Sequence, residues 1–193
     1  KKLLTFGFKS FFMKEDFLME LVLCKENGQT IIQENGHAIY TIEEEKEQGL
    51  LCVYLKNMYG EEVLGMYQIQ KWYTRFIRKH TEDFTIYAKD DKQGEMHGFK
   101  EGYEVAWKDV FYRFYGGYHA TKKTILCIDK EMQLAEFTMD AKPTVRLRNT
   151  SLNAIFALLL YMFDAHLAFD KFEEEAYLYR YKGRYQDAYE FEK

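Results

Sequence analysis

Basic and aromatic residues alternate in one short segment, residues 71–80, which reads Lys-Trp-Tyr-Thr-Arg-Phe-Ile-Arg-Lys-His. It holds four Lys or Arg residues and no carboxylate. On a β-strand, Lys71, Arg75 and Lys79 would share one face, with Trp72 on the other. Each cation near an anionic membrane contributes about 1 kcal/mol of attraction, and Trp72 suits the membrane interface. The segment therefore favours binding to anionic lipid, and the alternative is the solvated outer face of a strand.

A second basic pair, Arg146 and Arg148, alternates with Val145 and Leu147. Alternation along a strand places the two arginines on the outer face and the two apolar side chains in the core. We expect this pair either to add to a lipid-binding surface or to be ordinary surface.

Neither catalytic nor metal-binding motifs are recognisable. The five histidines show neither i, i+4 pairing nor an HExxH pattern, and GxSxG, Walker A and GxGxxG motifs are absent from the sequence. The carboxylate runs at 43–45 and 173–175 have the character of solvated surface. We expect a protein that is not an enzyme, with no catalytic residues, no metal site and no cofactor.

Composition limits the partners and the compartment. A net charge of −4 provides no general attraction to nucleic acid, so we expect no nucleic-acid binding. Cys24, Cys52 and Cys127 each lie in an apolar run without CxxC spacing, which favours buried, reduced thiols in the cytoplasm. The N-terminus lacks the apolar core of a signal peptide. We therefore expect a cytoplasmic protein, either free or peripheral at the membrane.

Short strands separated by turns that contain Asn or Asp together with Gly account for most of the first 148 residues, as in a β-barrel or sandwich. Fourteen segments have strand character: 3–13, 17–24, 29–33, 38–43, 50–56, 62–69, 72–78, 83–88, 95–99, 103–107, 111–118, 124–128, 134–139 and 144–148.

A helix is predicted over residues 151–169. Residues 154–163 carry no charge and no amide, and they are apolar on every side, so the helix should be fully enclosed. It is too short to span a bilayer, which needs about 20 apolar residues. Leu159 lies at its centre as a structural core residue. We expect Asp164 to be partly buried and hydrogen-bonded to surrounding strands, and His166 to favour the helix dipole.

This order of elements resembles the Tubby C-terminal-like superfamily. The segment 157–164, Ala-Leu-Leu-Leu-Tyr-Met-Phe-Asp, is similar to the run that closes the helix in the small LURP-one-related proteins of bacteria and plants, whose relatives include the phospholipid scramblases. The resemblance implies a mainly β fold, an antiparallel barrel of about twelve strands that encloses a hydrophobic C-terminal helix. Fourteen candidate strands exceed that number, so we expect some of them to be parts of one strand.

The expected domain organisation is a barrel domain over residues 1–170 and a charged, Tyr-rich extension over 171–193. We expect a non-enzymatic binding module of the bacterial branch that contacts anionic membrane lipid through its outer surface. The alternative is a structural or protein-interaction domain that binds a protein partner through residues 177–191, where tyrosines alternate with Arg and Lys as in interaction hot spots.

Overall fold

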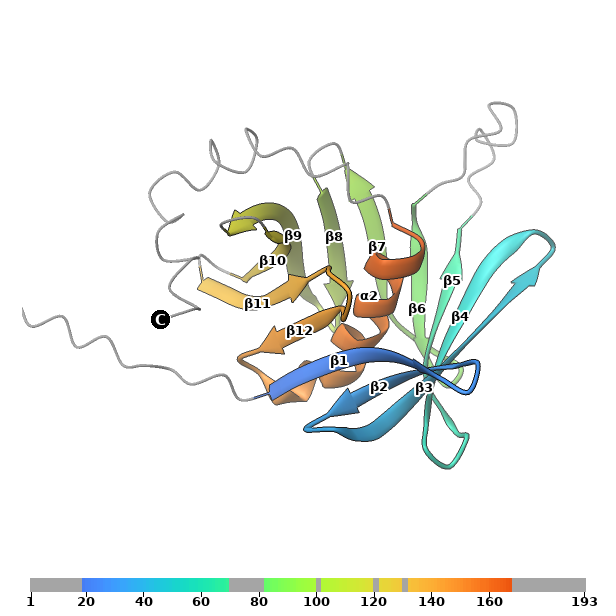
Figure 1. Ribbon diagram of the computed structural model, residues 1–193. Helices are drawn as coiled ribbons and strands as arrows, with labels where there is room; N and C mark the ends of the chain where they lie inside the picture. The colour runs from blue at the N-terminus through green and yellow to red at the C-terminus, as the bar shows by residue number, and fades with distance from the viewer. Residues whose placement is uncertain (1–18, 70–81, 100–101, 120–121, 130–131, 168–193) are drawn as a thin grey trace, which may run out of the picture.

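The structure is a computed structural model that describes residues 19–69, 82–99, 102–119, 122–129 and 132–167. Within these ranges twelve antiparallel strands pair in sequence order, and β1 pairs with β12 to close a barrel (Figure 1). The strands are β1 (Met19–Glu26), β2 (Gln29–Glu34), β3 (His37–Glu47), β4 (Leu50–Asn57), β5 (Glu62–Gln68), β6 (Phe84–Ala88), β7 (Asp91–Phe99), β8 (Gly102–Trp107), β9 (Val110–His119), β10 (Lys122–Asp129), β11 (Met132–Thr138) and β12 (Thr144–Leu147).

The predicted fold class is confirmed: the chain is mainly β, with an antiparallel barrel around one helix. Each of the twelve strands matches one predicted segment, so none of these twelve segments is part of a strand that another of them forms. The two remaining predicted strands, 3–13 and 72–78, lie outside the described residues. The predicted domain boundary at residue 170 also lies outside them.

Strand β3 extends further than its composition indicates. The sequence predicted an end at Glu43, but β3 continues to Glu47 because residues 43–47 pair with residues 50–54 of β4. The hairpin closes through Gln48 and Gly49, which both have positive φ angles, of 52° and 83°. Backbone pairing with an apolar neighbouring strand therefore outweighs the low strand propensity of consecutive glutamates.

Helix α2 (Asn153–Ala165) occupies the lumen of the barrel (Figure 1). A short 3₁₀ turn, η1 (Thr150–Leu152), precedes it, and the Asn149 side chain caps this turn by accepting a hydrogen bond from the Ser151 backbone N–H at 3.0 Å. Side chains on every side of the helix are buried, and Leu158, Leu159 and Leu160 are 0 % exposed. In the part of the chain that the structure describes, no helix is long and apolar enough to cross a membrane.

The helix ends at Ala165, four residues before its predicted end at 169. The backbone N–H groups of His166 and Leu167 both donate to the carbonyl of Met162, at 3.0 and 2.9 Å. This ending turns the chain so that the Leu167 side chain packs back into the core. The apolar Leu167 is therefore buried by packing beyond the end of the helix, and it is not part of another helical turn.

Aromatic side chains fill the space between the helix and the strands. Phe137 of β11 stacks on Phe156 at a centroid distance of 5.7 Å and meets Phe163 edge-on at 5.1 Å. Phe114 of β9 contacts the same two helix residues at 5.9 and 5.5 Å. Burial of one such ring stabilises the fold by about 1.5–3 kcal/mol. The described lumen is therefore a packed core rather than a ligand cavity.

We expect Leu159→Asp to prevent folding, because an unpaired carboxylate at a fully buried position is very costly. Leu159→Ala should fold but lose about 3 kcal/mol of unfolding free energy through the cavity it leaves. Urea unfolding followed by circular dichroism measures both. Asp164→Asn, a change at an exposed position of the same helix, is the control. A soluble Leu159→Asp variant with an unchanged melting curve would contradict the enclosed-helix model.

Candidate functional site

Three tyrosines from neighbouring strands gather on the outer face of the barrel. Leu64 and Met66 of β5 point into the core, so alternation places Gly65 and Tyr67 outside. Gly65 pairs in register with Tyr54 of β4 on one side and with Tyr87 of β6 on the other. The backbone register therefore puts a residue without a side chain between two aromatic ones.

The ring of Tyr67 lies over Gly65. A Cβ atom at position 65 would lie 2.8 Å from Cε2 of Tyr67, so glycine is what allows this close approach. Tyr67 stands nearly perpendicular to Tyr87, at 88° and 5.4 Å between centroids, and to Tyr54, at 82° and 5.7 Å. These edge-to-face contacts hold the three rings in fixed relative orientations.

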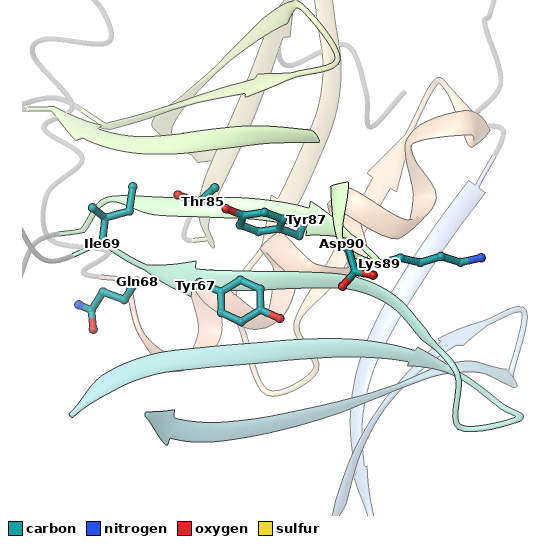
Figure 2. Close-up of a pocket in the computed structure, with 7 residues that line it drawn as sticks. All are labelled: Tyr67, Gln68, Ile69, Thr85, Tyr87, Lys89 and Asp90. Atoms are coloured by element: carbon teal, nitrogen blue, oxygen red, sulfur yellow. The ribbon is translucent and has the colours of Figure 1, made fainter. Parts of the chain in front are cut away.

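A shallow hollow of about 550 Å³ lies beside these rings, along the outer face of β5 and β6 (Figure 2). Figure 2 shows Ile69 and Gln68 at one end of the hollow and Lys89 and Asp90 at the other. Its volume falls within the range of small-molecule sites. The residues that line it are Tyr67, Gln68, Ile69, Thr85, Tyr87, Lys89 and Asp90.

Three ionisable groups on this face have raised pKa values. The Tyr54 hydroxyl donates to Oε1 of Glu45 at 2.6 Å, and this bond, together with burial, raises the Tyr54 pKa. Burial raises the pKa of Tyr67 and also that of the thiol of Cys52, the buried register partner of Tyr67 on the same face of β4. All three groups stay protonated at neutral pH, so none of them is an activated nucleophile.

His97 of β7 bridges two carboxylates on the adjoining part of the outer face. Its Nδ1 lies 2.9 Å from Oδ1 of Asp83, and its Nε2 lies 3.1 Å from Oε2 of Glu95. Only a protonated imidazole can donate to both. Glu95 also accepts a hydrogen bond from Lys92, which is the main reason that its pKa is lowered. Nδ1 thus links β7 to the residue before β6, whereas Nε2 contacts a carboxylate of its own strand. Among the described residues, no group of three His, Cys, Asp or Glu side chains is arranged to hold a metal.

Glu44 joins the helix to the barrel wall at the end of the barrel where α2 terminates. It faces inward, because it is paired with the buried Val53. Its carboxylate accepts a hydrogen bond from the Tyr161 hydroxyl, and Oε2 lies 2.7 Å from Nε2 of His166. The bond from Tyr161, and next the one from His166, lower the pKa of Glu44 despite partial burial.

One expectation is wrong at this end of the barrel, and one pair of contacts was not foreseen. Glu44 is exposed, as expected of its acidic run, but it is also the partner of Tyr161 and His166. Asp164 was expected to be partly buried, but it is exposed. The reason is geometric, since the helix ends at Ala165 and the last turn brings Tyr161 and His166, rather than Asp164, toward β3.

The predicted lipid-binding residues are not brought together by the described strands. Lys71, Trp72, Arg75 and Lys79 lie outside the described residues. Arg146 lies on the outer side of β12, where its Nε donates to Oε2 of Glu20 at 3.1 Å. In the ring of strands, β12 lies opposite β5 and β6, so neither Arg146 nor Arg148 reaches the face with the hollow. Sequence reasoning missed Tyr54, Tyr67 and Tyr87, although each directly follows an apolar residue that points inward.

Comparison with known proteins gives a likeness of fold alone. No protein-family model matches the chain, and no curated protein matches it. A solved crystal structure of a protein from Arabidopsis thaliana is similar, with a TM-score of 0.52 and 13% sequence identity, over 77% of this chain and 91% of the plant chain.

We expect Tyr161→Phe to lower the unfolding free energy by about 1 kcal/mol at neutral pH, because the ring stays and the bond to Glu44 is lost. The Glu44 pKa lies below its ordinary value of about 4.5, so this contribution is present above pH 4.5 and is lost as pH falls through the lowered value. The difference between variant and wild type should therefore shrink in acid. Urea unfolding at pH 7 and pH 3 measures it, with Tyr59→Phe on an exposed turn as the control. An equal difference at both pH values would contradict this role.

Proposed function

We propose that this protein is a non-enzymatic binding module that contacts anionic membrane lipid through its outer surface. We further propose that it belongs to the Tubby C-terminal-like superfamily, in the branch of the LURP-one-related and scramblase-like proteins. The observation that carries the proposal is the filled lumen: with α2 packed inside, a ligand has to bind outside the strands. The fold shared with the plant protein is consistent with the family assignment.

The distribution of charge favours one region as the lipid contact. Residues 19–69, which form β1 to β5, carry nine carboxylates and three amines, so this part of the surface would be repelled by an anionic membrane. Residues 70–81 carry four cations and no carboxylate. The connection follows Ile69, which lines the outer hollow, and the residues that flank it are joined, since the Ile69 N–H donates to the Asp83 carbonyl at 2.8 Å. We therefore assign the attraction to Lys71, Arg75 and Lys79, with Trp72 as the interfacial anchor.

Arg146 and Arg148 rank second in this proposal. The ion pair with Glu20 offsets the charge of Arg146. Glu136 of β11 is its register partner on the other side. A cation placed between carboxylates attracts an anionic surface less than one without such neighbours.

The alternative function is protein interaction through residues 177–191. Removing residues 171–193 distinguishes the two, because only the interaction model expects a change in the size of the protein or its complexes, whereas the lipid model expects liposome binding to persist. Size-exclusion chromatography with light scattering measures the first property, and liposome sedimentation measures the second.

We expect the wild type to sediment with anionic liposomes at low salt and to lose most of that binding near 1 M salt, where the Debye length falls to about 3 Å. Lys71/Arg75/Lys79→Ala should lose most of the low-salt binding while still folding. Lys25/Lys46/Lys142→Ala is the matched control, since it removes the same charge from exposed positions elsewhere. Absence of wild-type binding at low salt would refute the lipid proposal. Equal loss in both triple variants would refute the assigned site.

A further inference from the structure

The hollow on β5 and β6 has two aromatic sides at a right angle. Tyr67 and Tyr87 both line it, and their ring planes meet at 88°. The two rings cannot rotate freely, because Tyr67 rests on Gly65 and is flanked on its other side by Tyr54. Perpendicular aromatic faces held in this way are the arrangement that binds alkylammonium groups, through attraction between the cation and the ring quadrupoles.

The charges around the rings favour a cation against them. Glu45 accepts a hydrogen bond from the Tyr54 hydroxyl, and Oε1 of Glu62 lies beside Gly65. The charges of Glu62 and Glu47 act on Tyr67 strongly enough to add to the rise in its pKa. These carboxylates lower the free energy of a cation on the aromatic side of the hollow.

One cation and one carboxylate line the far end of the hollow. Lys89 is the one cation among the seven described residues that line it, and it is exposed in the β6–β7 turn beside Asp90. Figure 2 shows Asp90 next to Tyr87 and the Lys89 side chain extending beyond Asp90, away from the rings. Exposed side chains change rotamer within nanoseconds, so Lys89 can turn back toward the rings and meet an anion attached to the ammonium group by a short linker.

We propose that this hollow binds a zwitterion in which an alkylammonium group is joined to a phosphate, as in phosphocholine. The ammonium group lies against Tyr67 and Tyr87, and the phosphate lies next to Lys89. Free phosphocholine and the headgroup of a lipid share this chemistry. The residues assigned to it here, Tyr67, Tyr87 and Lys89, differ from those assigned to the anionic-lipid contact, so separate variants test the two proposals.

Chemical-shift titration of the ¹⁵N-labelled full chain tests the site with three probes: phosphocholine, tetramethylammonium and inorganic phosphate. We expect phosphocholine to bind most tightly, with affinity on the order of millimolar, and to shift the backbone amides of Thr85 and Tyr87. Tyr87→Leu should weaken phosphocholine and tetramethylammonium about two- to fivefold, whereas Tyr87→Phe, which keeps the ring, should not. Lys89→Gln should weaken phosphocholine but not tetramethylammonium.

Two control variants show whether binding belongs to this hollow. Tyr59→Leu removes an exposed tyrosine outside the hollow and should leave all affinities unchanged. Lys71/Arg75/Lys79→Ala should leave phosphocholine binding unchanged, even if it abolishes binding to anionic liposomes.

Sedimentation with phosphatidylcholine vesicles shows whether the phosphocholine group belongs to a lipid or to a soluble compound. Vesicle binding that Tyr87→Leu removes indicates a lipid headgroup. Binding of free phosphocholine without vesicle binding indicates a soluble ligand.

The proposal is overturned if tens of millimolar phosphocholine shifts no amide of β5 or β6. It is also overturned if Tyr87→Leu, folded by its melting curve, binds phosphocholine as the wild type does. Should Tyr87→Leu fail to fold, Tyr67→Leu serves the same purpose, because Tyr67 forms the other aromatic side.

Discussion

Burial of helix α2 inside the barrel is the interaction on which the rest of the structure depends. A closed ring of twelve described strands leaves an interior that needs filling, and the helix supplies side chains on all of its faces. Phe156 and Phe163 reach β9 and β11, while Tyr161 reaches β3. Because one helix contacts strands around the ring, its removal would expose the inner faces of many strands at once. Because this packing fills the lumen, a ligand of the described barrel would have to bind to its outer surface.

The end of the barrel near Glu44 shows how the helix is fixed along its axis. An apolar helix in an apolar lumen could slide, since hydrophobic contacts have no direction. Hydrogen bonds do have one, and Glu44 receives them from Tyr161 and His166 on the last turn. At the opposite end, the side chain of Asn153, the first residue of α2, is hydrogen-bonded to Tyr40 of β3. Polar contacts at both ends thus set the register of an otherwise non-directional core.

The sequence was sufficient for the architecture because alternation and all-round apolarity are local patterns. Strands around Leu64 and Met66, and the helix around Leu159, are read directly from neighbouring residues. The outer site is different: Tyr54, Gly65 and Tyr87 become neighbours only through the register of three strands. The inward direction of Glu44 could have been predicted from the sequence, since it lies two residues after the inward Ile42 on the same strand. Asp164 was misjudged because its burial depends on where the helix leaves the barrel.

Electrostatics constrains how the two proposed binding properties could work together. The carboxylates near the hollow, Glu45, Glu47 and Glu62, oppose close approach of an anionic bilayer, yet they favour the ammonium end of a zwitterion. Charges act over about 8–10 Å at physiological salt. Cations in residues 71–79 would therefore have to lead the approach to the membrane, with the acidic face held away from anionic headgroups. A zwitterionic headgroup carries no net charge and could enter the hollow without that penalty. An acidic barrel face is thus compatible with membrane contact only if the two lipid chemistries are recognised at different places on the surface.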